Sequence, residues 1–485
     1  MKLTLIDPLV GQSHGLKSMT AYLQSHGHEV KVITLNTSIV SLIHKYNHII
    51  RYTDSEINEI LKHCKGSDIV GITVFTNAYD MARHLTSEIR GKLDIPIIWG
   101  GIHPTLRPKE CMQFADMVCI GEGELSLLEL LNHMEKGTDY TSTKGIWFKK
   151  DGELIQNQNR ALINDLDMLP IEELRVEKFL QLVDGKIIVP DRHMFYSKNQ
   201  YSIATSRGCV YECTYCAHNH FTKLFGRKGY HRRRSVPHFM EELKIATSLY
   251  DNIERICFDD DTFLIRPVDE LKTFAEEYQK EIGLPFFCLS IPKGLNKEKL
   301  EIVISAGMVE IQFGIEATSR RILKMYSRPC YKEDVLKSDL IVQEVSKKTK
   351  KDVLVRYDLI LDNPWETREE KVEGLDFLKS LPRPYIISYF SLVFYPEVEL
   401  SKKAIEDGYV TDELADVYRK SYQIPKANYI NLLFYLLKYY GIGKVPYLLM
   451  VVLSSRLVIS ALDNKLTEAI GESISKLRTR MKYQK

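Results

Sequence analysis

The chain has 485 residues, which is long enough for several domains with sizeable hydrophobic cores. Its 66 basic and 64 acidic side chains nearly cancel, which argues against nucleic acid as the main partner, because phosphate binding usually needs a marked basic excess. Nine cysteines cannot all pair, and Asp7 interrupts a short N-terminal apolar run, so we expect no signal peptide, a cytoplasmic location and reduced thiols.

Residues 1–140 alternate short apolar runs with helical segments. The runs at 2–7, 29–34, 68–75, 95–100 and 117–121 are typical of buried parallel strands, and helical patterns at 16–27 and 78–93 separate them. This alternation predicts an α/β domain with a doubly wound parallel sheet, whose ligand loops lie at the strand ends.

Residues 141–198 have a different pattern. The stretch 144–157 predicts a β-hairpin that turns at Asp151 and Gly152. The stretch 162–170, "LINDLDMLP", and its surroundings read as a linker between domains.

Residues 199–400 return to the strand and helix alternation. Six apolar runs, at 201–206, 253–259, 286–291, 309–315, 353–361 and 386–394, predict a partial (βα)6 barrel of the TIM type. Such barrels place their chemistry at the carboxyl ends of the strands. Residues 401–485 predict a helical C-terminal region, and its apolar runs at 427–437 and 445–455 are too short to span a bilayer.

Three cysteines lie within eight positions, in "SRGCVYECTYCAHN" (206–219), as Cys209, Cys213 and Cys216. A cubane iron–sulfur cluster normally takes four thiolates, so three of them leave one iron open to another ligand. Zinc is the alternative metal. His218 and His220 lie close by, but no second Cys or His pair stands at finger spacing.

This loop resembles the signature of radical S-adenosylmethionine enzymes, Cys-x3-Cys-x-aromatic-Cys after the first barrel strand, with Tyr215 in the aromatic place. The resemblance implies a [4Fe–4S] cluster on the three cysteines, with S-adenosylmethionine bound to the open iron beside Tyr215. It further implies that one electron, from a flavodoxin- or ferredoxin-like donor, cleaves the sulfonium to a 5′-deoxyadenosyl radical.

Two barrel segments extend the resemblance. Residues 258–263 match a Phe-x-Asp-Asp-x-Phe element of the cobalamin-dependent members, which places Asp260 and Asp261 near the ammonium of S-adenosylmethionine or near the substrate; a solvated acidic turn is the alternative. "FGIEATS" (313–319) resembles the family's Gly-Ile-Glu-Ser-Gly-Ser stretch, so Glu316 is expected to hydrogen-bond S-adenosylmethionine; a helix cap is the alternative.

Two further segments are less specific. "LDNPWETREE" (361–370) contains a capping box, but it has Asp362 and Trp365 where many relatives have glycine, so we expect a less open backbone and a pocket shaped by Trp365. The basic run 226–243 begins a helix at Ser235 and reads either as a solvated face or as a partner for an anionic cofactor or substrate.

The N-terminal strand ends resemble the cobalamin-binding domain that precedes many radical S-adenosylmethionine enzymes. The matching residues are Gly100, Gly101, His103, Pro104, Thr105, Gly121, Glu122, Gly123 and Glu124. The cobalt-ligating Asp-x-His-x-x-Gly motif of other cobalamin proteins is absent, so His103 is expected to be a wall or nucleotide-tail contact. A sheet domain without a cofactor is the alternative.

The resemblance covers about residues 1–400 and implies a cobalamin-dependent methyltransferase acting on a poorly activated carbon. One alternative is a non-methylating oxidation or ring-forming reaction on the same domains, as in anaerobic cyclases. A second alternative is a redox or corrinoid sensor without turnover. The substrate is not readable, and the aliphatic and aromatic stretch 426–455 reads as core packing, as a contact for a lipidic substrate or as a peripheral membrane contact.

Overall fold

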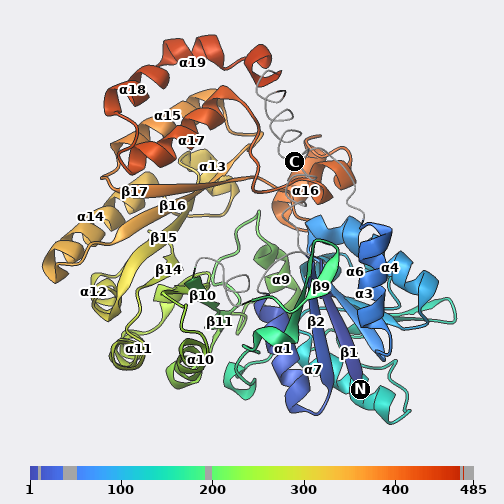
Figure 1. The fold of residues 1–485 in the computed structure, drawn as a ribbon. Coiled ribbons are helices and arrows are strands. Elements are labelled where there is room, and N and C mark those ends of the chain that lie inside the picture. Colours follow the sequence, from blue (N-terminus) through green and yellow to red (C-terminus); the bar gives the residue numbers. More distant parts are fainter. Residues whose placement is uncertain (9–12, 36–51, 192–198, 470–472, 474–485) are drawn as a thin grey trace. The chain divides into compact units, whose positions relative to one another are not determined.

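The computed structural model describes residues 1–8, 13–35, 52–191, 199–469 and 473 (Figure 1). The chain forms two compact units. The first comprises Met1–Ile253 and Phe394–Lys420, and the second comprises Glu254–Val393 and Ser421–Lys485.

The core of the first unit is a parallel sheet. Its strands are β1 (Lys2–Asp7), β2 (Glu29–Leu35), β3 (Ile69–Thr73), β4 (Ile97–Gly100) and β5 (Met117–Cys119), in the spatial order β5-β4-β3-β1-β2. All five predicted strands are therefore confirmed. The reversal of strand order beside β1 is the topological position where doubly wound sheets bind ligands.

Residues 141–188 extend this sheet at both edges. The predicted hairpin forms β6 (Ile146–Lys150), which pairs antiparallel with β5, and β7 (Glu153–Ile155), which pairs antiparallel with β6. At the opposite edge, β8 (Phe179–Val183) pairs parallel with β2, and β9 (Lys186–Ile188) follows it. These last two strands were not predicted, because each is short and lies in a segment that reads as a linker.

Helices cover the sheet of the first unit. They include α1 (His14–Ser25), α3 (Asp54–Cys64), α4 (Tyr79–Lys92), α5 (Ile102–Leu106), α6 (Pro108–Cys111) and α7 (Glu124–Glu135). Side chains begin two of them: Ser13 accepts from the Leu16 amide at α1, and Thr53 forms a capping box with Glu56 at α3. The same unit contains β10 (Gln200–Ile203), β11 (Ser206–Arg207), α9 (Ala217–Phe225), β12 (Arg232–Arg233) and α10 (Val236–Leu249).

A distant segment, Phe394–Lys420, completes the first unit. It contains α16 (Glu399–Glu406). The Tyr418 hydroxyl donates to Glu110 at 2.7 Å, and Arg419 pairs with Asp80 at 2.7 Å. The segment is thus tied to α4 and α6 by direct polar contacts.

The second unit carries a parallel sheet in the order β13 (Arg255–Phe258), β14 (Phe286–Ser290), β15 (Met308–Glu316), β16 (Leu354–Leu361) and β17 (Tyr385–Ser391). Its helices α11 (Val268–Glu281), α12 (Lys297–Ala306), α13 (Arg320–Met325), α14 (Lys332–Thr349) and α15 (Arg368–Ser380) alternate with the strands. With β10, which is counted in the first unit, all six predicted barrel strands are confirmed.

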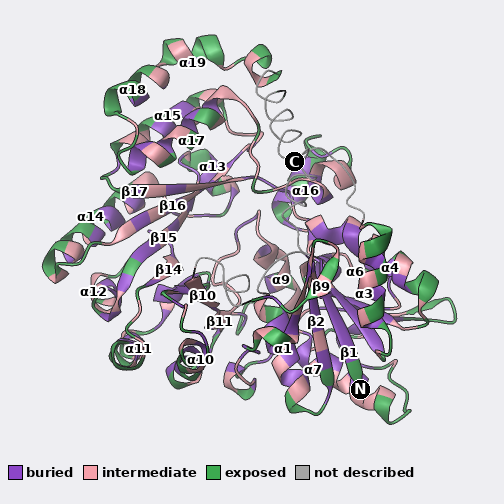
Figure 2. Ribbon diagram, viewed as in Figure 1, coloured by how far each residue is buried: buried purple, intermediate pink, exposed green. Residues whose placement is uncertain are grey.

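The C-terminal part of the second unit contains α17 (Tyr429–Gly441), α18 (Tyr447–Leu453) and α19 (Arg456–Leu462), and residues 465–469 after them are also helical. The inner face of α17 packs against β17 and α15, whereas α18 and α19 are mostly exposed (Figure 2). Among the helices that the structure describes, none is both long and apolar enough to cross a membrane.

Candidate cofactor site

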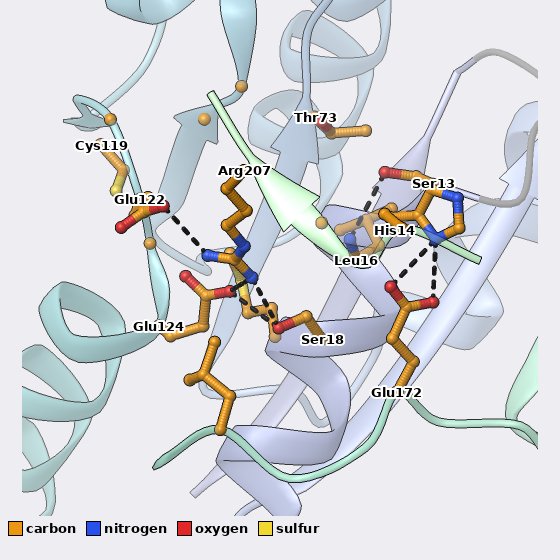
Figure 3. Close-up of a pocket in the computed structure, with 18 of the residues that line it drawn as sticks. Ser13, His14, Leu16, Ser18, Thr73, Cys119, Glu122, Glu124, Glu172 and Arg207 are labelled. Carbon is orange, nitrogen blue, oxygen red and sulfur yellow. Dashed lines mark hydrogen bonds and ion pairs between the residues drawn. The ribbon is translucent and has the colours of Figure 1, made fainter. Parts of the chain in front are cut away.

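A cavity of about 610 Å³ lies in the first unit at the carboxyl ends of its parallel strands (Figure 3). Leu5, Ile72, Ile98 and Cys119 line it from four neighbouring strands, and further side chains of α1 and of the stretch 166–172 close it. Burial raises the pKa of the Cys119 thiol to about 12, so this sulfur is a neutral wall group near pH 7. The size and the mostly apolar lining suit a small-molecule or cofactor pocket.

Six of the nine predicted cobalamin residues line this cavity: Gly100, Gly101, Gly121, Glu122, Gly123 and Glu124. Gly101 has a φ of 104°, and a Cβ there would stand 3.0 Å from the Thr73 hydroxyl. Gly121 has a φ of 81°. Both loops therefore keep their backbone close to the cavity in a conformation that other residues rarely adopt.

The other three predicted residues, His103, Pro104 and Thr105, are buried and do not line the cavity. Thr105 connects the two glycine loops, since its hydroxyl donates to the Gly101 carbonyl at 2.8 Å and accepts from the Gly121 amide at 3.0 Å. Thr105 therefore supports both glycine loops without lining the cavity, which accounts for its match to the family pattern.

His103 is fully buried between the aromatic rings of Tyr79 and Tyr418, each 5.0 Å away. Its Nδ1 lies 3.3 Å from the Thr76 hydroxyl. Burial lowers its pKa to about 3, which keeps the imidazole neutral. These contacts favour a packing role inside the first unit.

A partly buried ion-pair network forms one wall of the cavity. Arg207 donates to Glu124 at 2.6 Å, to Glu122 at 3.2 Å and to the Ser18 hydroxyl at 2.9 Å (Figure 3). Glu124 is 2% exposed; burial raises the pKa of its carboxyl, but the Arg207 charge and hydrogen bonds outweigh this and hold it below its usual value. Arg207 therefore links the strand before the cysteine loop to the cavity loop of Glu122 and Glu124.

The basic run 226–243 contributes to the same network. Arg232 is 8% exposed and pairs with Glu122 at 2.9 Å, while Arg234 is 7% exposed and pairs with Glu242 at 2.7 Å. The interpretation as a solvated face is wrong for these two arginines, because they are buried and pair with carboxylates of the protein itself. The sequence carried no sign of the Arg232 pair, since Glu122 is 110 positions away along the chain, whereas Glu242 lies in the same run as Arg234.

A second polar corner of the cavity was also not predicted. His14 Nδ1 lies 2.9 and 3.0 Å from the two carboxylate oxygens of Glu172 (Figure 3). The buried Lys17 ammonium stands 4.0 Å from the same carboxylate. His14 begins α1, and Glu172 lies in the stretch that reads as a linker. No motif in the sequence joins them.

The three cysteines follow β11, which pairs antiparallel with β12. Cys213 is buried, and Cys209 and Cys216 are half-buried. Within the described residues, no three His, Cys, Asp or Glu side chains form a ready-made metal site. The three thiols are therefore identified as candidate cluster ligands by their spacing and their common loop. Cys216 directly precedes α9, and Tyr215 is half-buried beside it in the chain.

Gly208 fixes how the chain enters this loop. Its φ is 80°, and a Cβ would stand 2.2 Å from the Tyr230 carbonyl oxygen. We expect Gly208→Ala to shift the loop, to lower the free energy of unfolding by more than about 3 kcal/mol and to reduce bound iron, because backbone strain adds to a steric overlap. Urea unfolding and iron content measure both effects.

Gly229→Ala is the matched control for that prediction. Gly229 has a similar φ of 77° but open space at its Cβ position, so the control isolates the conformational cost. If both variants lose equal stability and keep their iron, the overlap with Tyr230 does not hold the loop.

The remaining predicted residues lie in the second unit. Asp260 and Asp261 follow β13, the first buried and the second exposed. Glu316 ends β15 with a φ of 62°, and its carboxylate lies 3.7 Å from Arg328, which also donates to the Gly314 carbonyl at 2.7 Å. Ser319, not Glu316, caps α13, so the alternative role of Glu316 as a helix cap is wrong.

The loop after β16 corrects one expectation. Asp362 keeps a left-handed φ of 62°, so the replacement of glycine does not close that conformation. The Asp362 carboxylate accepts from Ser391, from the Lys426 amide and from Asn431 at 2.6–2.9 Å, and these hydrogen bonds can offset the strain. The capping box of Thr367 and Glu370 is confirmed.

The fold and the cavity define a two-unit α/β protein with a cofactor-type pocket in a doubly wound domain and a cysteine loop after the first strand of a second α/β repeat. Comparison with protein families agrees. The B12 binding domain matches residues 8–131, and the Radical SAM superfamily matches residues 203–373. The chain therefore combines a B12 binding domain with a Radical SAM domain, the arrangement found in cobalamin-dependent radical S-adenosylmethionine enzymes.

Known proteins resemble it along most of its length. An uncharacterized methyltransferase of Pyrococcus horikoshii is 29% identical over 73% of either chain, and cytidylyl-2-hydroxyethylphosphonate methyltransferase of Streptomyces wedmorensis is 24% identical over 84% of this chain and 80% of its own. The structure of the methyltransferase TsrM from Kitasatospora setae, with cobalamin and a [4Fe–4S] cluster bound, matches with a TM-score of 0.64 at 18% identity, covering 84% and 75% of the two chains.

Proposed function

We propose that this enzyme transfers a methyl group to a poorly activated carbon of a small or lipidic molecule. The observation that carries the proposal is the Arg207 network, which joins the cysteine loop to a glycine-lined cavity inside one compact unit. The two relatives that match most of this chain are both named methyltransferases, which supports the same reaction class.

The residues present fit the cofactors of the family. The glycines of two cavity loops present bare backbone to the cavity, and three thiols on one loop are a donor set for a cluster with one open iron. We assign the cavity-lining glycines, with Glu122 and Glu124, to cobalamin and Cys209, Cys213 and Cys216 to the cluster. Bound there, these groups and S-adenosylmethionine would supply radical chemistry and a transferable methyl group.

The chain itself binds and positions these groups. Glu316 and Asp260 are proposed to bind S-adenosylmethionine with Asp261 and Tyr215, since Glu316 holds a rare backbone conformation at a strand end and Asp260 is buried. Arg207 fixes Glu122 and Glu124, and Thr105 fixes the glycine loops, so that the cavity wall is rigid before any ligand enters.

The proposed cellular compartment and electron donor follow the expectations from the sequence. The odd number of cysteines, nine, supports the cytoplasm as the proposed compartment. An external one-electron donor of the flavodoxin or ferredoxin type remains part of the proposal.

A ring-forming or oxidative reaction is the second candidate. It is favoured by one observation: an anaerobic magnesium-protoporphyrin IX monomethyl ester cyclase of Synechocystis is 30% identical over 175 residues, which is 33% of its own length. The short overlap makes this the weaker reading.

Methyl-labelled S-adenosylmethionine tests the proposal without knowledge of the substrate. The anaerobically reconstituted holoenzyme, once reduced, should release 5′-deoxyadenosine and move the label to cobalamin, as followed by mass spectrometry. Release of 5′-deoxyadenosine with unlabelled cobalamin would favour the oxidative reaction and overturn the methyltransferase. Absence of both products would favour a sensor without turnover and would also overturn it.

A further inference from the structure

The C-terminal helices of the second unit expose an unusual number of apolar side chains. α18 buries only Met450 and α19 buries only Ile459, so each seven-residue helix turns most of its surface to solvent (Figure 2). Leu448 is 76% exposed and Leu457 is 85% exposed. We define the C-terminal apolar surface by its exposed residues, which are Tyr447, Leu448, Leu449, Val451, Val452, Leu457, Leu462 and Leu466. Clusters of this size usually mark an interaction site.

This surface does not result from a missing contact within the unit. The buried side chains of α17, among them Leu433 and Leu437, already cover β17 and α15. α18 and α19 contact α17 and each other, and Figure 1 shows them on its outer side. The apolar surface is therefore an outward layer carried on a packed helix.

Within residues 421–462, which hold all of the C-terminal apolar surface except Leu466, the charges have a single sign; Asp463 and Glu468 follow. Residues 421–462 contain no Asp or Glu, and their four cations are Lys426, Lys438, Lys444 and Arg456, although the whole chain is nearly neutral. Lys438, Lys444 and Arg456 are exposed. Tyr435 and Tyr439 lie on α17 with their hydroxyls 2.8 Å apart, and tyrosine rings favour the boundary between lipid and water.

The backbone bends between these helices instead of forming one long rod. Gly443 has a φ of 77°, Pro446 precedes α18, and Ser454 and Ser455 separate α18 from α19. Short apolar helices joined by bends can lie along a surface but cannot span a bilayer.

We propose that the C-terminal apolar surface docks the enzyme on the anionic face of a lipid bilayer. Leu448 and Leu457 insert among the upper acyl chains, and Lys438, Lys444 and Arg456 meet the anionic headgroups. A second copy of the chain fits less well, because a two-fold interface would set this acid-free, cationic segment against itself. The inference does not depend on the reaction that the enzyme catalyses.

Vesicle sedimentation of the full-length protein tests this proposal. Phosphatidylcholine vesicles with about one third phosphatidylglycerol should bind the protein in a salt-sensitive manner, and pure phosphatidylcholine should bind it more weakly. Leu448→Glu with Leu457→Glu should lower the affinity more than about tenfold, because two apolar insertions are lost. Lys444→Gln and Arg456→Gln should each lower it roughly fivefold, only with anionic vesicles.

Leu340→Glu is the matched control, since Leu340 is 65% exposed on α14 of the same unit. It should leave vesicle binding unchanged. No sedimentation with either vesicle, or an equal loss in the control, would overturn the proposal. A concentration-dependent dimer that becomes a monomer in the Leu448→Glu, Leu457→Glu variant would overturn it in favour of a second copy. The circular dichroism spectrum and melting temperature of each variant confirm its folding.

Discussion

Cys213→Ser should abolish both the iron–sulfur cluster and the cleavage of S-adenosylmethionine. Cys213 is the buried member of the cysteine loop, so its replacement removes a thiolate and leaves a poor ligand in the same volume. Loss of a residue that merely supports a metal ligand costs about 10–100-fold in affinity, so loss of the ligand itself should cost more than about 100-fold. Iron content, the visible spectrum and 5′-deoxyadenosine release measure the effect anaerobically.

Cys64→Ala controls for the removal of a sulfur elsewhere. Cys64 is fully buried at the end of α3, and burial raises the pKa of its thiol to about 12, so it is a neutral core group. The control should keep its iron and its activity. Full cluster occupancy in Cys213→Ser would remove the basis for the whole functional assignment.

Arg207→Met should lower the free energy of unfolding of the first unit by about 3 kcal/mol, because it leaves the buried Glu124 without its cation. We place the effect at the low end of the usual range for buried pairs because the Arg207 side chain is 26% exposed. The cavity wall should also loosen, which weakens cobalamin binding. Urea unfolding in a Trp365→Phe background follows this unit alone, because Trp99 and Trp147 both belong to it.

Two comparisons sharpen this test. Arg227→Met removes a surface pair with Glu212, in which Arg227 is 71% exposed, and should cost no more than about 1 kcal/mol. Glu124→Gln combined with Arg207→Met should cost less than the sum of the two single changes, because no charge is then left buried without a partner. Strict additivity, or equal losses in Arg207→Met and Arg227→Met, would show that the network does not stabilise the unit.

The sequence predicted the strands well because their signal is local. Apolar runs such as 2–7 and 97–100 recur at strand length between helical patterns, and every one of the predicted strands forms. The Asp151–Gly152 turn was equally local, since both residues adopt the positive φ that such a hairpin requires. Strands β8 and β9 were missed because their short runs stand among polar residues and become strands only beside β2.

The site was predictable only where a motif lies in one stretch of chain. The glycine loops and the cysteine loop were found by spacing. Three contacts of the site join residues that are far apart in the sequence. Arg207 and Glu124 are 83 positions apart, His14 and Glu172 are 158 apart, and Arg232 and Glu122 are 110 apart. Such contacts depend on how the elements pack, and a single sequence holds no local pattern for them.

The return of residues 394–420 to the first unit limits how the enzyme can be dissected. A fragment that stops near residue 253 would lose Tyr418, whose ring covers His103 and Tyr79 and whose hydroxyl reaches Glu110. A chimera that borrows the cofactor-binding half must therefore graft two separate pieces of the gene. Recombination at a single crossover point would likewise separate Tyr418 from His103 and Tyr79.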